Sequence, residues 1–276
     1  MSFEQPQSLQ AALSALDTHS FKVLAGGTDV FPSAPPGPMT QMILDVTRID
    51  GLSGVTHKDG MTRIGAATTW TDIVQAQLPD AFLGLQAAAR EVGSIQIQNA
   101  GTIAGNICNA SPAADGVPAL LALDACVEIA SASRELRIVA LSDFILGVRK
   151  TALAADELVT AVLIPDQPPG TGSAFEKLGG RRYLVISTCM TAANILLDHQ
   201  GRIARAWVAV GSCSAIAQRL HALETDMIGQ HPENVQVTQA HLSPLSPIDD
   251  VRGSGAYRLD IVQEQCKRAI IKAAQQ

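Results

Sequence analysis

The chain has 276 residues, of which 47% are hydrophobic and 17% are charged, and its formal net charge is −6. This length is sufficient for one large domain or two ordinary ones, and the high apolar content excludes an intrinsically disordered chain. Lys and Arg are scattered along the sequence, so the basic footprint of a nucleic-acid-binding protein is missing. No segment approaches the run of about 18 apolar residues that a membrane-spanning helix needs.

The cysteines and histidines argue against a metal site in this chain. The five cysteines lie far apart without any C-x-x-C pair, and the six histidines show no paired ligand spacing. Zinc-ribbon and iron–sulfur ligand patterns are therefore excluded. An odd cysteine count, with no basic and apolar leader at the N-terminus, predicts a protein of the reducing cytoplasm.

The first half of the chain is predicted to mix helices and strands, from apolar spacing and turn residues. Helices are predicted over 7–17, from Ile73 onward after a Thr71-Asp72 cap, over 81–92 and over 118–123. Strands are predicted over 21–24, 42–46, 61–65, 126–130, 135–139 and 157–164. The proline-rich segment 31–38 and the Gly/Asn-rich segment 93–115 lack any long periodic pattern and are predicted to be loops.

A linker is predicted over 165–172, which contains three prolines and two glycines. We therefore expect two domains, residues 1–170 and 171–276. Beyond the linker, strands are predicted over 173–177, 187–197 and 203–210, with helices over 215–223 and 257–273. Strands followed by helices are typical of an α+β domain.

The first candidate binding motif is the sequence LAGGTDV, which follows the predicted strand 21–24. Adjacent glycines allow positive φ and close approach of a ligand, and successive amides in such a turn form an anion-binding nest. The motif matches neither G-x-G-x-x-G nor the lysine-bearing phosphate loop. An ordinary tight turn after a strand remains the alternative.

The second candidate motif runs from Asn99 to Asp115 and consists of small, amide and hydroxyl residues. No Lys or Glu occurs from Gly93 to Asp115, although both are common in surface loops. Small residues that form hydrogen bonds suit a buried polar ligand, and Asp115 could accept hydrogen bonds from ribose-like hydroxyls. A structural loop whose side chains cap their own backbone remains the alternative.

Together the two motifs resemble those of the FAD-binding subunits of molybdenum hydroxylases, the family of xanthine dehydrogenase and carbon monoxide dehydrogenase. Ala25-Gly26-Gly27-Thr28-Asp29 is similar to the family's first flavin loop, and Thr102 to Asn106 followed by Asn109 to Asp115 is similar to its second. The resemblance continues through Glu157-Leu158-Val159 and Phe175 to Leu178, so it covers essentially the whole chain.

The resemblance implies an α+β fold, in which a two-subdomain PCMH-type FAD-binding domain precedes a small α+β C-terminal domain. It implies that the first loop holds the FAD pyrophosphate and that the second lies along the ribityl chain and the flavin. Leu158 or Val159 would lie near the isoalloxazine ring, and Lys177 would approach the flavin. The implied cofactor-binding residues are Leu24, Ala25, Gly26, Gly27, Thr28, Asp29, Val30, Phe31, Thr102, Gly105, Asn106, Ser111, Asp115, Leu158, Val159 and Lys177.

One position departs from the family pattern. Ala104 stands where the second loop usually has glycine. A methyl group disfavours positive φ and narrows the approach of a ligand, so we expect the chain to pass this point with negative φ.

The implied function is electron transfer in a heteromeric hydroxylase that acts on a heterocycle or aldehyde. A molybdopterin large subunit oxidises the substrate, and an iron–sulfur small subunit with two [2Fe-2S] clusters relays electrons to the FAD of this chain. The FAD then reduces NAD, a quinone or O₂, in a heterotrimer or a dimer of heterotrimers. The flavin supplies the chemistry, so no catalytic residue is expected. A stand-alone FAD reductase of the same fold and a non-catalytic flavin-binding scaffold are the alternatives.

Overall fold

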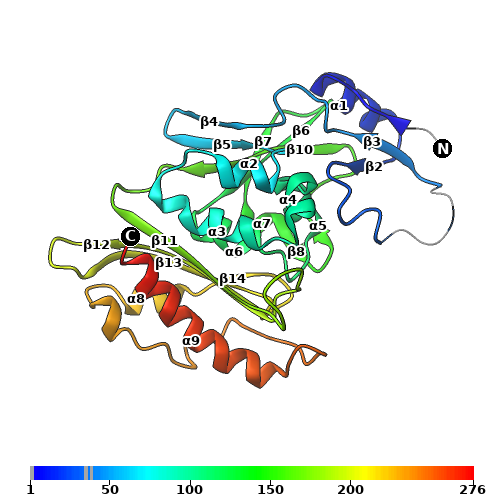
Figure 1. Ribbon diagram of the computed structural model, residues 1–276. Helices are drawn as coiled ribbons and strands as arrows, with labels where there is room; N and C mark the ends of the chain where they lie inside the picture. The colour runs from blue at the N-terminus through cyan, green and yellow to red at the C-terminus, as the bar shows by residue number, and fades with distance from the viewer. Residues whose placement is uncertain (1–2, 34–36, 38–39) are drawn as a thin grey trace.

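The computed structural model describes residues 3–33, 37 and 40–276, which form a mixed helix-and-strand structure (Figure 1). Its helices are α1 (Leu9–Thr18), α2 (Trp70–Gln75), α3 (Leu83–Glu91), α4 (Ile95–Ala100), α5 (Ile103–Asn109), α6 (Gly116–Ala122), α7 (Leu141–Phe144), α8 (His221–Asp226) and α9 (Gly255–Ala273), with 3-10 turns η1 (Asp80–Phe82) and η2 (Pro232–Asn234). Its strands are β1 (Phe3–Glu4), β2 (Phe21–Leu24), β3 (Met42–Asp45), β4 (Val55–Lys58), β5 (Met61–Gly65), β6 (Cys126–Ser131), β7 (Arg137–Ala140), β8 (Ile145–Gly147), β9 (Lys150–Thr151), β10 (Glu157–Pro165), β11 (Thr171–Leu178), β12 (Cys189–Leu197), β13 (Ile203–Gly211) and β14 (Gln218–Arg219).

The strands form three larger sheets. The first is parallel, with order β1-β3-β2, and the second is antiparallel, with order β4-β5-β10-β6-β7. The third, β11-β12-β13-β14, is also antiparallel and begins at Thr171, within the last two residues of the predicted linker. β8 and β9 form a separate hairpin.

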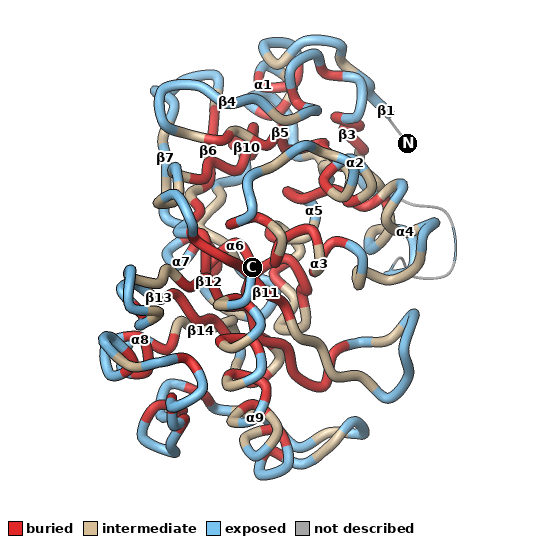
Figure 2. The backbone as a smooth tube through the Cα atoms, turned by 60° about the vertical axis from the view of Figure 1, so that its left-hand side comes forward, coloured by how far each residue is buried: buried red, intermediate tan, exposed pale blue. Residues whose placement is uncertain are grey.

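The helices are arranged in layers with the sheets. Figure 1 shows α3 and α6 between the second and third sheets, and both helices contact strands of the third. The long helix α9 lies on the opposite face of the third sheet, against β11 and β12. Figure 2 shows that the buried segments run through the two antiparallel sheets and the helices between them. The third sheet is therefore covered on both faces, which explains why β12 is apolar along most of its length.

Most predicted elements are confirmed, but α2 begins three residues earlier than predicted. Thr69, rather than Thr71, is its N-cap, and the helix begins at Trp70 instead of Ile73. The Thr69 side chain accepts a hydrogen bond from the Asp72 amide at 3.1 Å, and Asp72 accepts one from the Thr69 amide at 3.0 Å. This reciprocal capping box fixes the helix start three residues earlier.

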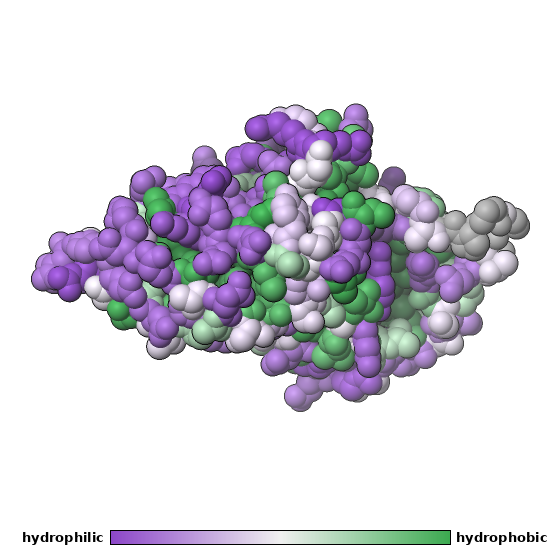
Figure 3. All heavy atoms as spheres, turned by 90° about the horizontal axis from the view of Figure 1, so that it is seen from below, coloured by the Kyte–Doolittle hydropathy of each residue, from purple (hydrophilic) through white to green (hydrophobic). Residues whose placement is uncertain are grey.

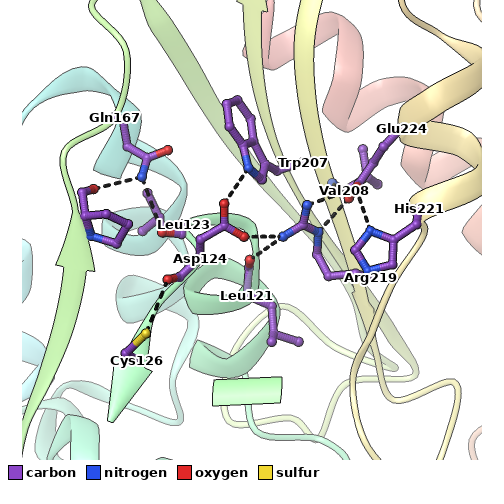
Figure 4. A network of polar contacts seen from close by, with 11 residues as sticks. Leu121, Leu123, Asp124, Cys126, Gln167, Trp207, Val208, Arg219, His221 and Glu224 are labelled. Carbon is purple, nitrogen blue, oxygen red and sulfur yellow. Dashed lines mark hydrogen bonds and ion pairs between the residues drawn. The ribbon is translucent and has the colours of Figure 1, made fainter. Parts of the chain in front are cut away.

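The prediction of a helix over 215–223 is wrong, because this segment contains the short strand β14 before α8 begins at His221. β14 pairs with β13 through the Ala209–Arg219 register. The Arg219 guanidinium donates to Asp124 at 2.7 Å and to Glu224 at 2.5 Å (Figure 4). The strand pairing and the contact with Asp124, 95 residues away in the sequence, outweigh the local helical pattern.

The Asp124 carboxylate joins the turn after α6 to the third sheet. It accepts from the Trp207 indole at 2.7 Å, in addition to Arg219. Figure 4 shows both side chains converging on this carboxylate from the strands of the third sheet. Trp207, which is 6% exposed, therefore supplies a polar link as well as apolar packing.

Candidate cofactor site

A pocket of about 330 Å³ lies where the segment after β2 meets α4, α5 and β10. Figure 3, which views the molecule from below, shows a recess with hydrophobic walls on the right-hand side of the molecule. The pocket brings together residues from both predicted motifs and from the strand before the linker. The predicted residues that line it are Ala25, Gly26, Gly27, Thr28, Asp29, Val30, Thr102, Gly105, Asn106, Leu158 and Val159.

The two glycines of the first motif are required for different reasons. A Cβ atom on Gly26 would lie 1.8 Å from the Ala100 carbonyl oxygen, so any side chain would force the first loop away from the end of α4. Gly27 has φ +70°, and its Cβ would lie 2.5 Å from the Phe31 ring. The glycine pair therefore both brings the two motifs into contact and turns the backbone.

The backbone amides of the first loop are free to bind a ligand. The turn is closed by two hydrogen bonds, from Phe31 N to Gly27 O and from Ser33 N to Asp29 O, each 3.2 Å long. Within residues 3–33, 37 and 40–276, the amides of 26–30 donate no hydrogen bond. Adjacent free amides in a glycine turn are the donors of an anion-binding nest.

The segment 93–115, which includes the second motif, is not the irregular loop that the sequence predicts, because it contains α4 and α5. Thr102 caps α5 by accepting a hydrogen bond from the Gly105 amide at 3.1 Å. Ala104 lies in the first turn of α5, lines the pocket and is not among the residues with positive φ. The expectation of negative φ at Ala104 is confirmed, and its methyl group is accommodated by helical geometry.

Asn106 presents an unsatisfied buried oxygen at the pocket. Its Oδ1 atom is buried and has no hydrogen-bond partner in the part of the chain that the structure describes. An unsatisfied buried polar atom costs about 1–3 kcal/mol.

The remaining predicted residues lie outside the pocket lining. Leu24 is the buried end of β2, and Phe31 is 58% exposed with its ring beside Gly27. Ser111 accepts a hydrogen bond from the Ala113 amide at 3.3 Å. Asp115 and Lys177 contact each other instead, from the start of α6 and from β11.

The pair of Asp115 and Lys177 is buried and bridges distant parts of the chain. Lys177 Nζ lies 2.8 Å from an Asp115 carboxylate oxygen and also donates to the Glu91 carbonyl at 2.8 Å. The Ser187 hydroxyl donates to the other Asp115 oxygen at 2.6 Å. Burial raises the pKa of the Asp115 carboxyl above its usual value, and the neighbouring Lys177 ammonium opposes this shift.

Several pocket residues were missed from the sequence. Lys22, Val92 and Cys108 line the pocket although none was singled out. Cys108 follows Gly105 by three positions, so helical spacing in α5 is a signal that could have found it. Burial raises the pKa of the Cys108 thiol to about 12, so it stays protonated at neutral pH.

Neither a metal centre nor a membrane-spanning helix is found in the described part of the chain. No cluster of three His, Cys, Asp or Glu residues there could hold a metal ion. None of its helices is both long and apolar enough to span a bilayer.

Comparison with known proteins identifies the family to which this chain belongs. Residues 1–167 match the FAD binding domain in molybdopterin dehydrogenase, and residues 173–273 match the carbon monoxide dehydrogenase flavoprotein C-terminal domain. The chain belongs to the FAD-binding subunits of molybdenum hydroxylases. It is therefore a flavoprotein component of an oxidoreductase, and its α+β fold class is as predicted.

Individual members of the family are similar over nearly their whole length. The chain is 33% identical to the xanthine dehydrogenase FAD-binding subunit of Escherichia coli O157:H7, covering 99% of this chain and 95% of the relative. It is 31% identical to the nicotine 6-hydroxylase medium subunit of Paenarthrobacter nicotinovorans, covering 98% and 96%. The structure of carbon monoxide dehydrogenase from Hydrogenophaga pseudoflava aligns with a TM-score of 0.88 at 25% identity, covering 99% and 96%.

The residues of the pocket fit FAD on two observations. The free amides of 26–30 suit its pyrophosphate. Leu158 and Val159 give one wall an apolar surface that suits an aromatic ring. The chemistry of the pocket lining is therefore compatible with FAD.

Proposed function

We propose that this FAD-binding subunit transfers electrons within a heteromeric molybdenum hydroxylase. In this function, electrons pass from the [2Fe-2S] clusters of a partner through FAD to NAD, a quinone or O₂ during hydroxylation of a heterocycle or aldehyde. The observation that carries the proposal is the convergence of both glycine-containing motifs on one pocket. When bound, FAD supplies the exchange between single-electron and two-electron chemistry.

In this proposal, each wall of the pocket contacts a different part of FAD. The amides of 26–30 and the Thr28 hydroxyl bind the pyrophosphate, and Lys22 contributes positive charge at the same end. Thr102, Gly105 and Asn106 orient the sugar-like chain. Leu158 and Val159 exclude water from the ring, since both are buried.

Asp115 and Lys177 form a second polar group of the site, together with Ser187. Glu91 accepts from Lys177 through its carbonyl, and the next residue, Val92, lines the pocket. We propose that the Lys177 ammonium is held next to this wall, where it can approach the flavin. Ser111 is proposed as a further contact, because it follows α5 directly.

The proposed partners are an iron–sulfur small subunit and a molybdopterin large subunit, in a heterotrimer or a dimer of heterotrimers. The names of similar proteins support an assembly, since one is a medium subunit and another is subunit alpha of the 6-hydroxypseudooxynicotine dehydrogenase complex. We also propose that the FAD-binding and C-terminal domains meet near residue 170, between β10 and β11.

The decisive experiment measures flavin in the chain and electron flow in the complex. The chain is purified with its co-purifying subunits, and the FAD released on denaturation is quantified by absorbance. We expect one FAD for each copy of this chain, and reduction of that FAD by a heterocycle or aldehyde only when the partners are present. Reduction of a substrate by NADPH with the isolated chain would show a stand-alone reductase instead.

A further inference from the structure

Arg258 is a charged side chain that is buried near the start of α9. It is only 2% exposed, and Figure 1 shows α9 on one side of the third sheet and α6, which follows the second motif, on the other. Its Nη2 atom donates to the Asp250 carboxylate at 2.6 Å, and its Nε atom has no partner among the described residues. Apolar residues often replace a buried ion pair without loss of stability, so stability alone does not account for this guanidinium.

The guanidinium of Arg258 joins the adjacent ends of two strands. Its Nη1 atom donates to the carbonyl of Thr188, the residue before β12, and at 3.0 Å to the carbonyl of Ser212, the residue after β13. The two strands are antiparallel neighbours at this end, with Met190 opposite Gly211. Arg258 therefore fixes the points at which two segments of the chain meet the edge of the third sheet.

The segment at Ser212 contacts the backbone of the second motif. The Ser212 amide donates to the Pro112 carbonyl at 3.0 Å, and Pro112 follows Ser111 in that motif. Ser212 has φ +62°, in the left-handed region that favours glycine. Such a backbone conformation persists only where its surroundings hold it, and here Arg258 binds the carbonyl of Ser212 while Pro112 binds its amide.

The segment at Thr188 reaches the second motif through its neighbour Ser187. The Ser187 hydroxyl donates to Asp115 at 2.6 Å, and the other oxygen of this carboxylate pairs with Lys177. Because Arg258 holds the Thr188 carbonyl, it also fixes the backbone that carries this hydroxyl. Both segments that Arg258 holds therefore end on the second motif, one at its backbone and one at its carboxylate.

We propose that Arg258 is a positioning residue for the bound flavin. It acts through Ser212 on the backbone of the second motif, and through Ser187 on the pair of Asp115 and Lys177. The inference rests on the proposed function, in which the Lys177 ammonium approaches the flavin. A positive charge beside a flavin favours its reduced, more negative form, so the placement of this ammonium affects the reduction potential.

The test compares Arg258→Met with Arg258→Lys in the full-length chain. FAD affinity is measured by titration of the FAD-free chain, and the midpoint potential of bound FAD by reductive titration against a reference dye. We expect Arg258→Met to weaken FAD binding about tenfold, since hydrogen bonds from a charged group are lost, and to lower the potential, since the Lys177 ammonium is no longer held in place. Arg258→Lys keeps a donor for the two carbonyls and should recover part of both effects.

The matched control variant is Arg219→Met. Arg219 is also largely buried, with 13% of its side chain exposed, and it also donates to a carbonyl and to carboxylates, those of Leu121, Asp124 and Glu224. In the described part of the chain its hydrogen bonds do not reach 187–188 or 212. Arg219→Met should therefore lose stability in urea while its FAD affinity and potential stay at the wild-type values.

A third variant, Ser187→Ala, isolates one of the two connections and serves if Arg258→Met does not fold. It removes only the hydroxyl that donates to Asp115, so the potential should fall as in the Arg258 variants. In the double variant with Arg258→Lys, the shift in potential should be smaller than the sum of the single shifts, because both changes act on the same carboxylate.

The outcomes separate this inference from the proposed function. Weaker FAD binding and a lower potential in Arg258→Met, with neither change in Arg219→Met, support the inference. Wild-type affinity and potential in Arg258→Met overturn it, as do wild-type values in both Arg258→Lys and Ser187→Ala if Arg258→Met does not fold. Equal changes in Arg219→Met also overturn it, because they show general destabilisation. A wild-type chain that binds no FAD refutes the proposed function itself.

Discussion

Gly26 and Gly27 show how two neighbouring glycines support one site by different physical means. Gly26 permits contact with the Ala100 carbonyl, and Gly27 adopts φ +70°. Gly51 allows the cost of positive φ to be separated from the effect on the pocket. It has a similar φ of +78°, no atom lies within 4 Å of its Cβ position, and it lies outside the pocket.

Gly27→Ala and Gly51→Ala should therefore each lose about 1 kcal/mol of folding stability, from the left-handed backbone. Only Gly27→Ala should lose FAD affinity, by roughly tenfold or more, because its methyl group displaces the Phe31 ring and the amide nest. Urea denaturation and FAD titration measure the two quantities. Equal FAD affinity in both variants would contradict the assignment of the first loop.

Cys108 gives a prediction about thiol chemistry in the pocket. Burial raises its pKa to about 12, so the thiolate that reacts with alkylating agents is scarce at neutral pH. In the native chain without FAD, iodoacetamide at pH 8 should modify Cys108 far more slowly than an unfolded cysteine. Mass spectrometry of time points follows the reaction, with urea-unfolded chain as the control. Fast modification of native Cys108 would show that the pocket wall opens.

At the scale of elements, a salt bridge joins β7 to β10 and makes the stability of the fold depend on pH. Arg137 in β7 donates to the Glu157 carboxylate in β10 at 2.9 and 2.6 Å. The Ala154 amide donates to the same carboxylate at 2.8 Å. The hydrogen bond from Arg137 is the main cause that lowers the pKa of Glu157 below its ordinary value.

Because the folded pKa of Glu157 lies below that of the unfolded chain, about 4.3, ionised Glu157 stabilises the fold above that pH. This contribution decreases as the pH falls through the folded pKa. Glu157→Gln should lower the free energy of unfolding by about 2 kcal/mol at pH 7, and the difference from wild type should narrow below about pH 4. Urea denaturation at several pH values measures it. A difference that is constant with pH would exclude this ion pair as its origin.

For the whole molecule, the buried Asp115–Lys177 pair links α6 to the third sheet. Either single variant, Asp115→Asn or Lys177→Met, leaves a buried group without its partner and should cost about 3–5 kcal/mol. The double variant should cost clearly less than the sum, which urea denaturation in a double-mutant cycle measures.

The exposed pair of Arg268 and Glu264, 2.8 Å apart on α9, is the matched control. Its coupling should stay below about 1 kcal/mol. Additive effects at Asp115 and Lys177 would show that the buried pair does not join these elements. FAD titration of the same variants tests whether either side chain also contributes to the flavin site.

Across the whole molecule, some helices and strands are encoded by local sequence, whereas others depend on contacts between distant residues. The strands β2, β10 and β13 and the long helix α9 follow their apolar spacing and lie close to their predicted bounds. α4 and α5 were missed, since each is shorter than two full turns and leaves no long periodicity. β14 was predicted as helix, because its pairing with β13 and the contacts of Arg219 are long-range.

The sequence by itself determined the chemistry of this protein. The glycines of the first loop and the Thr102–Asn106 segment identify a flavin-binding family, because such a site depends on short runs of residues whose order is local. The tertiary structure decided which residues contact one another. It placed Lys22 and Cys108 in the pocket, joined Asp115 to Lys177 and Ser187, and set Arg252 beside the connection between β11 and β12. These residues are distant in sequence, and only the packing of the sheets and helices brings them together.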